Sequence, residues 1–272
     1  MGSENVRDSK YREETAIKLI AKMPVLAAIA FRNSVGLPIV GPNKNMSFEH
    51  NFLHMMFSDP MDSQSHIPII FQTMMMKMLI IYADMGQGPS TTAVRIAGSS
   101  LANPYATISA GIASLWGTHH GGAAEECLRM FKQISSVDKV SDFVKGVKQK
   151  EYRLWGFGHR ILKGYDCRAR AIKKMIEEFK EKIGLNQELS DLFDIAVEIE
   201  KQAMADEYFT SRGVYPNVDY YCGILLSAMH IPASMISVII AISRSTGWIA
   251  HWREMMGDQV IKIYRPRQIY VG

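Results

Sequence analysis

Residues 90–116 read STTAVRIAGSSLANPYATISAGIASLW, a segment in which small side chains recur at almost every turn. Small side chains let two helices approach closely, because nothing bulky holds their backbones apart. Pro104 lies inside the segment and opposes the continuation of a helix. The segment therefore predicts a central packed helix or helix pair, bent near Pro104. The small residues are Ala93, Ala97, Gly98, Ala102, Ala106, Ala110, Gly111 and Ala113.

Helical patterns dominate the chain on both sides of this segment, and convincing alternating strand patterns are absent. Leu189 to Met204 has apolar side chains at the spacing of an amphipathic helix. Loops rich in Gly and Pro at 36–45 and 85–89 separate the helices. Further helices are expected over 13–34, 51–57, 67–84 and most of 215–256, with a basic tail over 262–272. The sequence predicts an all-α fold.

The composition is that of a globular protein, because 47% of the 272 residues are hydrophobic and 21% are charged. The net charge of +4 is mild and does not indicate nucleic-acid binding. Cys127, Cys167 and Cys222 form no CxxC pair, so we expect no disulfide framework, no metal site and a reducing compartment. The longest apolar run, Ile231–Ser243, ends at Arg244. It falls short of the roughly 18 residues that a membrane span needs, so no span is expected.

Four short segments combine histidine, aspartate and arginine with glycine-rich turns. Any one alone would be weak evidence, because GFGH or HGG occurs by chance in unrelated loops. All four in this order and at this spacing form a specific signal. The segments are LWGTHHGGA at 115–123, GFGHR at 156–160 with DCRA at 166–169, YPNVD at 215–219 leading to Gly223, and TGWIAHW at 246–252 with RPRQ at 265–268.

Together these segments resemble the citrate synthase family over nearly the whole chain, and NFLHMMF at 51–57 is closest to its bacterial-type branch. The resemblance implies a large helical domain at 1–118 and 225–272 and a smaller helical domain at 119–224. The active site would lie in the cleft between them. It also implies a homodimer with residues 90–116 at the subunit interface. The usual N-terminal segment of the family is missing from this sequence.

The family carries out a step of the tricarboxylic acid cycle: it joins acetyl-CoA to oxaloacetate and hydrolyses the thioester to give citrate. No cofactor is implied, because the CoA thioester is itself a substrate. The chemistry needs a base for a weakly acidic methyl group and two hydrogen-bond donors, one for the enol and one for the ketone. The resemblance makes Asp219 the base, His120 the donor to the enol and His159 the donor to the ketone.

Arginines would bind the two carboxylates of oxaloacetate, because a guanidinium forks onto a carboxylate. Arg168 and Arg244 match these positions, and Arg265 matches the arginine that the partner subunit supplies in the family. The resemblance places CoA along Trp155, Gly156, Phe157 and Gly158, with Lys163 near its phosphates.

The same residues also have purely structural interpretations. Asp219 precedes an apolar helical run and could be an N-cap. His120 could occupy a glycine-rich turn, His159 an ordinary loop, and Arg244 the end of a buried helix. Trp248 and Trp252 are interpreted as core or interface residues. Residues 139–174 hold eleven Lys or Arg against three Asp or Glu, which fits either a solvated face or a phosphate-binding site.

The sequence departs from the family at the oxaloacetate end of the site. Where the family reads approximately HADHEQNCST, this chain reads YADMGQGPST at 82–91. Met85 thus replaces a histidine that binds oxaloacetate, and Gly88 replaces an asparagine. A thioether cannot donate a hydrogen bond, and losing one charge-assisted bond costs on the order of 1.5–3 kcal/mol. Ala124 replaces an asparagine beside the enol donor, and Cys167 a proline before the carboxylate-binding arginine.

Two functions therefore stay open. The catalytic trio and the three arginines favour a citrate-synthase-type enzyme, with weak or lost activity or a shifted keto acid. Met85, Gly88, Ala124 and the short N-terminal part favour a pseudoenzyme, a structural subunit that keeps the dimer scaffold inside a larger protein assembly. The compartment would be the mitochondrial matrix or the bacterial cytoplasm.

Overall fold

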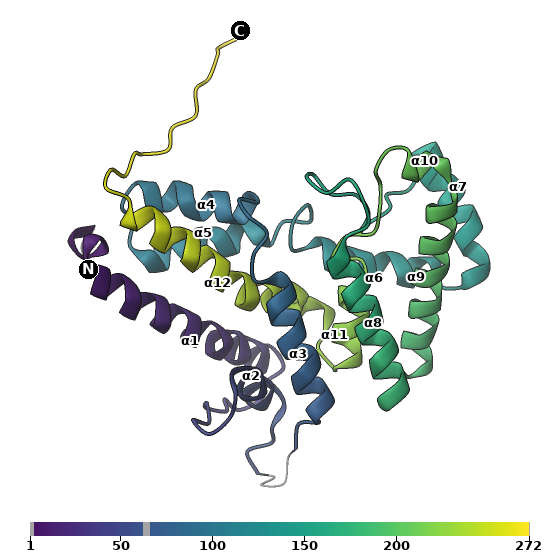
Figure 1. Cartoon of the computed structure of the whole chain (residues 1–272). Coiled ribbons are helices and arrows are strands. Elements are labelled where there is room, and N and C mark those ends of the chain that lie inside the picture. Colours follow the sequence, from purple (N-terminus) through teal and green to yellow (C-terminus); the bar gives the residue numbers. More distant parts are fainter. Residues whose placement is uncertain (1–2, 62–65, 272) are drawn as a thin grey trace. The chain divides into compact units, whose positions relative to one another are not determined.

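The computed structural model describes residues 3–61 and 66–271, and every regular element in those ranges is a helix (Figure 1). β pairing in the described ranges is limited to a bridge between Phe157 and Pro216. The all-α prediction is confirmed. Residues 1–2, 62–65 and 272, which the predicted large domain and basic tail include, lie outside the described residues.

The α-helices are α1 (Ser9–Ser34), α2 (Phe48–Phe57), α3 (Ile69–Tyr82), α4 (Pro89–Ser99), α5 (Pro104–Leu115), α6 (Ala123–Ile134), α7 (Val140–Gln149), α8 (Cys167–Lys182), α9 (Gln187–Ala205), α10 (Glu207–Thr210), α11 (Cys222–Ala228) and α12 (Ile236–Gly257). Short 3-10 turns are η1 (Ser3–Arg7), η2 (Val137–Lys139) and η3 (Ala233–Met235).

Side-chain caps explain where two of these helices begin. Asp8 accepts hydrogen bonds from the backbone N–H groups of Lys10 (2.7 Å) and Tyr11 (3.2 Å). Because an N-cap side chain satisfies donors that a helix start leaves unpaired, α1 begins at Ser9, before the expected start. Asn103 caps α5 in the same way, so the small-residue segment is a helix pair that breaks just before Pro104.

The chain divides into two compact units. The first unit comprises Met1–Pro68, Met75–Trp116 and Ile239–Gly272. The second comprises Ile69–Met74 and Gly117–Val238. Helices α3 and α12 each contribute residues to both units. The assignment of 1–118 with 225–272 as a large domain and 119–224 as a small one stays a prediction.

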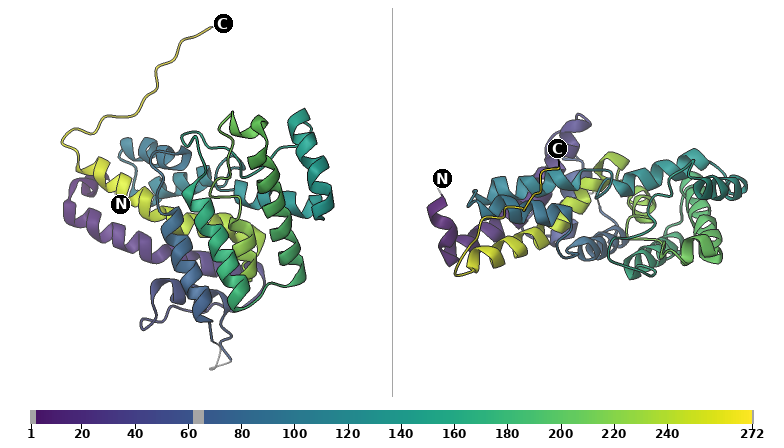
Figure 2. Two further views of the ribbon diagram at one scale, coloured as in Figure 1. Left: turned by 45° about the vertical axis from the view of Figure 1, so that its right-hand side comes forward. Right: turned by 90° about the horizontal axis from the view of Figure 1, so that it is seen from above.

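The first unit packs α4, α5 and α12 side by side (Figure 2). A Cβ on Gly111 of α5 would lie 2.6 Å from a methyl carbon of Val94 and 3.1 Å from the ring of Trp248. Trp248 and Trp252 are fully buried, and the indole N–H of Trp248 donates to Ser90 at 3.1 Å. Both tryptophans are therefore core residues, one of the two places expected for them, the core or an interface.

By length and composition alone, residues 233–257 form a helix that contains an 18-residue window long and apolar enough to cross a membrane. Within the described structure, 67% of that window is buried. A buried helix of this kind also forms the core of a globular unit, so length and composition do not indicate a membrane span here.

The second unit is built around the short helix α11, which contacts α6, α8 and α9. Residues 220–226 are buried, and several of their side chains have no exposed surface. The turn before α11 therefore leads directly into a helix that is packed against three longer helices. This turn carries the YPNVD segment at 215–219.

Candidate functional site

Two of the sequence segments, GFGH and YPNVD, lie side by side in the second unit. The N–H of Gly158 donates to the carbonyl of Tyr215 at 2.8 Å, and the N–H of Asn217 donates to the carbonyl of Gly156 at 2.8 Å. The side-chain amide of Asn217 also donates to the carbonyl of Gly158 at 2.8 Å. These three bonds fix the loop before His159 against the turn that carries Asp219.

Asp219 is half-buried in the turn before α11. Its N–H donates to the side-chain oxygen of Asn217 at 3.0 Å. The N-cap position of α11 is Tyr221, two residues later, so the interpretation of Asp219 as an N-cap is wrong. Burial raises the pKa of the Cys127 thiol on α6, and the charge of Asp219 raises it further. The charge of Asp219 and burial thus both favour the protonated, uncharged form of the Cys127 thiol.

The ring of His159 is held in one orientation by its own loop. Its Nδ1 accepts from the backbone N–H groups of Ile161 and Leu162, each at 3.2 Å. Burial lowers the pKa of His159, and the positive charge of Arg168 lowers it further. A neutral ring whose Nδ1 accepts carries its proton on Nε2. His159 can therefore donate a hydrogen bond from Nε2 at neutral pH.

This geometry predicts how His159 titrates. Because its pKa is lowered in the folded state, the unfolded chain binds the proton more tightly. Protonation therefore favours unfolding, and this residue lowers stability as pH falls below the ordinary histidine pKa of about 6.5. NMR titration should give a midpoint for His159 below that value. Arg168→Gln should move the midpoint upward, whereas a midpoint unchanged by Arg168→Gln would contradict the assigned charge contact.

Arg168 is paired with Asp166 at the start of α8. Its Nε donates to Oδ1 of Asp166 at 3.1 Å and its Nη2 donates to Oδ2 at 2.8 Å. Burial opposes ionisation of Asp166, but the hydrogen bonds from Arg168 outweigh it and hold the pKa of this carboxyl below its usual range. Asp166 is 2% exposed, and its N–H donates to the carbonyl of Pro216 at 3.3 Å. Asp166 thus orients Arg168, a role that its own stretch of sequence does not indicate.

His120 lies in the turn that leads into α6. Its N–H donates to the carbonyl of Gly117 at 2.9 Å, and the N–H of Ala123 donates to the carbonyl of His120 at 2.9 Å. The hydroxyl of Ser237 donates to the carbonyl of Gly121 at 3.4 Å. His120 therefore does occupy a glycine-rich turn, three residues before the start of α6, the helix that carries Cys127.

The segment expected to bind CoA has an aromatic and cationic surface. Trp155 is half-buried, with the guanidinium carbon of Arg153 at 3.9 Å from its ring centre. Arg153 also contacts Nε2 of His119. Phe157 packs edge-on against the buried Tyr220, with ring centres 4.8 Å apart. Neither Arg153 nor His119 was predicted to belong to this surface, although Arg153 is only two residues from Trp155.

Several basic side chains of residues 139–174 form ion pairs near the surface. Lys145 pairs with Asp142 at 3.0 Å, and Lys148 pairs with Asp206 at 2.6 Å. These pairs belong to a solvated face, since their members are largely exposed or half-exposed. Lys163 is exposed and, within the described residues, forms no ion pair. Its place near the phosphates of CoA stays a prediction.

Arg244 belongs to the first unit and is 5% exposed in the middle of α12. Its Nε donates to the carbonyl of Tyr82 at 2.7 Å, at the end of α3. The interpretation of Arg244 as the end of a buried helix is wrong, because α12 continues to Gly257. Three residues further along α12, a Cβ on Gly247 would lie 2.4 Å from the carbonyl oxygen of Ala83. Arg244 therefore lies beside the segment that leads to Met85.

The departure segment follows α3 directly. Asp84 accepts from the N–H of Gly86 at 2.9 Å and lies 3.3 Å from Nε2 of His251. Met85 is half-buried, and Gly88 is the N-cap of α4, where it supplies no side-chain hydrogen bond. Arg265 lies further on, exposed in the irregular tail after α12.

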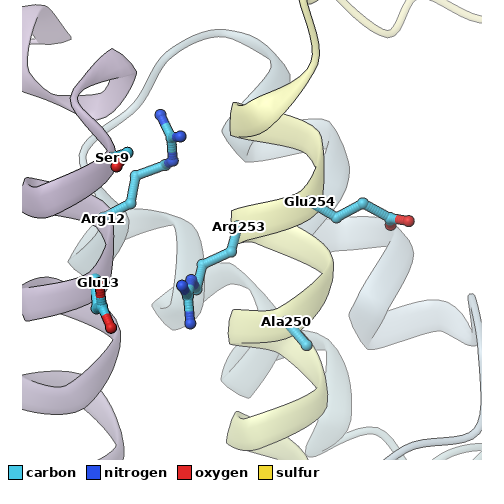
Figure 3. A pocket seen from close by; sticks show the side chains of 6 residues that line it. All are labelled: Ser9, Arg12, Glu13, Ala250, Arg253 and Glu254. Carbon is cyan, nitrogen blue, oxygen red and sulfur yellow. The ribbon is translucent and has the colours of Figure 1, made fainter.

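A pocket of about 430 Å³ lies between α1 and α12 in the first unit (Figure 3). Two arginines and two glutamates line it together with a serine and an alanine, so its charges balance. None of the predicted catalytic or substrate-binding residues lines it. Its lining residues are Ser9, Arg12, Glu13, Ala250, Arg253 and Glu254.

The family model for the C-terminal domain of citrate synthase matches residues 2–267. The chain belongs to the citrate synthase family. The citrate synthase of Thermoplasma acidophilum, solved with carboxymethyl coenzyme A and oxaloacetate, is 32% identical with a TM-score of 0.87, over 97% of this chain and 67% of that one. The Pyrobaculum aerophilum enzyme is 35% identical with a TM-score of 0.85, over 97% of this chain and 62% of that one. The Thermotoga maritima enzyme is 30% identical with a TM-score of 0.84, over 100% of this chain and 72% of that one.

The chain thus spans between 62% and 72% of the length of these citrate synthases. Its second unit brings together His159, Arg168 and the turn with Asp219, whereas Arg244 and Met85 belong to the first. Among the described residues, no group of three or more His, Cys, Asp and Glu side chains is arranged to hold a metal ion.

Proposed function

We propose that this chain catalyses the condensation of acetyl-CoA with oxaloacetate to give citrate. The observation that carries the proposal is the pairing of the GFGH loop with the YPNVD turn. It sets a neutral Nε2–H donor, His159, in one unit with a half-buried carboxylate, Asp219. The Thermoplasma relative was solved with carboxymethyl coenzyme A and oxaloacetate, which supports a CoA compound and oxaloacetate as ligands of this site.

In this proposal, Asp219 takes a proton from the acetyl methyl group while His120 donates to the thioester oxygen, which gives the enol. The enol carbon then forms a bond to the ketone carbon of oxaloacetate, whose oxygen takes the proton of His159. Arg168 and Arg244 would bind the oxaloacetate carboxylates, with Arg265 supplied by a partner subunit. Water finally cleaves the C–S bond and releases CoA as its thiol.

The test is the loss of thioester absorbance when both substrates are added to the purified chain. Thioester absorbance is preferable to a thiol reagent, because the exposed Cys167 would itself react with such a reagent. Loss of thioester that requires oxaloacetate supports the proposal. No loss from a folded chain would favour the second candidate, a non-catalytic structural subunit of a larger assembly.

The second candidate, the non-catalytic subunit, rests on Met85 and Gly88. If these two residues only weaken oxaloacetate binding and the chain is still an enzyme, Met85→His with Gly88→Asn should lower the KM for oxaloacetate roughly ten- to a hundredfold. The KM for acetyl-CoA should stay unchanged. Gly88 has φ −64°, so asparagine fits, and it would also cap α4. Ala124 should be left alone, because it is fully buried and a larger side chain would overpack α6.

The matched control is Met76→His, which places a histidine on an exposed methionine of α3. It should leave both KM values as they are. If the double variant changes neither constant while the wild type is active, Met85 is not at the oxaloacetate site. If the wild type already binds oxaloacetate as tightly as ordinary citrate synthases, Met85 is not damaging.

We also propose that the chain forms a homodimer through α5. Gly98 and Gly111 face inward against Met255 and Trp248, whereas Ala113 and Ile112 are exposed. Ala113→Glu should weaken association at least about tenfold in sedimentation equilibrium, because it would bury a charge. Ala30→Glu, on an exposed alanine of α1, should not. A monomeric wild type, or equal effects of the two variants, would contradict the dimer.

A further inference from the structure

A half-buried carboxylate forms hydrogen bonds to both loops of the second unit. Glu200 of α9 has a side chain only 12% exposed. Its Oε1 accepts from the hydroxyl of Tyr165 at 2.7 Å. Its Oε2 accepts from the ammonium of Lys173 at 2.8 Å and from the hydroxyl of Tyr221. These four residues are called the Glu200 cluster, and they come from four separate parts of the chain.

Two of the three partners of Glu200 lie close in sequence to residues of the candidate site. Tyr165 directly precedes Asp166, which holds Arg168. Tyr221 follows Asp219 by two residues at the start of α11. One carboxylate thus bonds both the end of the His159 loop and the end of the Asp219 turn. Backbone hydrogen bonds join the loops at residues 156–158 and 215–217. Glu200 joins them a second time, through Tyr165 and Tyr221.

All three partners of Glu200 donate to its carboxylate oxygens. Burial raises the pKa of Tyr165 and of Tyr221, and the neighbouring carboxylate of Glu200 raises both further. Both phenols therefore keep their protons and donate. The ammonium of Lys173 also donates only, so all three partners need an acceptor. Lys173 balances the charge, and the guanidinium of Arg170 lies 5.0 Å from the ring centre of Tyr165.

We propose that Glu200 is a positioning residue, which sets the distance between His159 and Asp219 through Tyr165 and Tyr221. The inference rests on the proposed condensation, in which the ketone donor and the base must act on one substrate pair. Glu200 has no role as acid or base in this scheme. Its effect is on geometry, and misplacement by about 1 Å can cost roughly a hundredfold in rate.

The test compares Glu200→Gln, Tyr165→Phe and Tyr221→Phe with Glu198→Gln. Glu198 lies on the same helix, but its carboxylate bonds Lys201 and Gln202 near the surface. Glu200→Gln should lower kcat roughly ten- to a hundredfold with each KM changed less than about threefold. Each Tyr→Phe variant should lower kcat several-fold. Glu198→Gln should match the wild type.

A double-mutant cycle separates positioning from simple destabilisation. If Glu200 acts through Tyr221, the kcat loss of Glu200→Gln with Tyr221→Phe should be smaller than the product of the single losses. If Glu200 only stabilises the fold, kcat per folded molecule stays constant while the unfolding temperature falls, and the proposal is overturned. Should Glu200→Gln not fold, the two Tyr→Phe variants carry the same test, because each removes only one hydroxyl.

A wild type without turnover would overturn the proposed condensation, and hydrogen exchange would then read the geometry by itself. In Tyr221→Phe and Glu200→Gln, the amides of residues 159–166 and 217–222 should exchange faster, while those of α7 should not change. Unchanged exchange in both segments would overturn the role of Glu200 whether or not the chain is active.

Discussion

Gly156→Ala is expected to destabilise the second unit by roughly 2–5 kcal/mol, from a left-handed backbone and an overpacked contact together. Gly156 has φ +74°, a conformation that L side chains rarely adopt. A Cβ there would also lie 2.7 Å from the sulfur of Cys127 and 2.7 Å from the backbone Cα of Tyr220. The turn before α11 cannot move away from Gly156 without straining the hydrogen bonds that join it to this loop.

The matched control is Gly158→Ala, two residues further along the same loop. Gly158 has φ +79°, but nothing lies within 4 Å of the place where its Cβ would be. It should therefore pay the backbone cost alone, about 1–2 kcal/mol. Urea unfolding followed by circular dichroism measures both variants. Equal losses of stability would show that the contact with Cys127 and Tyr220 relaxes without cost.

Local signals were enough to predict most of the helices. Pro104 and the small residues around it predicted the α4–α5 pair, because proline and close packing act over a few residues. The start of α1 was placed four residues late, since the cap by Asp8 was not recognised. Residues 215–221 were included in a mostly helical stretch, yet they form the turn that pairs with the GFGH loop. That pairing joins segments about sixty residues apart, which no local pattern reports.

The residues of the candidate site also fall into those that the sequence indicated and those that it did not. The resemblance supplied His120, His159, Asp219 and Arg168, and their catalytic and binding roles remain predictions. Asp166 and Glu200 were missed because each looks like an ordinary surface charge in its own segment. Glu200 is one of many charged residues on α9, and its partners lie 21 to 35 positions earlier or later in the chain. Only the folded chain shows that Asp166 is buried, that Glu200 is half-buried, and that both carboxylates bond to the loops of the site.

Asp219→Asn is expected to lower kcat by roughly a hundred- to ten-thousandfold, the usual contribution of a general base. The amide has the shape of the carboxylate but cannot take a proton from the acetyl methyl group. The fold should be kept, because Asp219 is bonded to Asn217 through its backbone N–H, which the substitution leaves in place. Each KM should change far less than kcat, since the loss falls on the transition state.

The control for this prediction is Asp194→Asn, an exposed aspartate on α9 for which no partner is seen among the described residues. It should retain full activity, and both variants should unfold at the wild-type urea concentration. A second readout is exchange of the acetyl-CoA methyl protons with deuterated water in the presence of a non-reacting oxaloacetate analogue. Proton removal alone drives this exchange, so Asp219→Asn should slow it as much as it slows turnover. If turnover falls but exchange persists, another group removes the proton, and Asp219 acts at a later step than the one assigned to it.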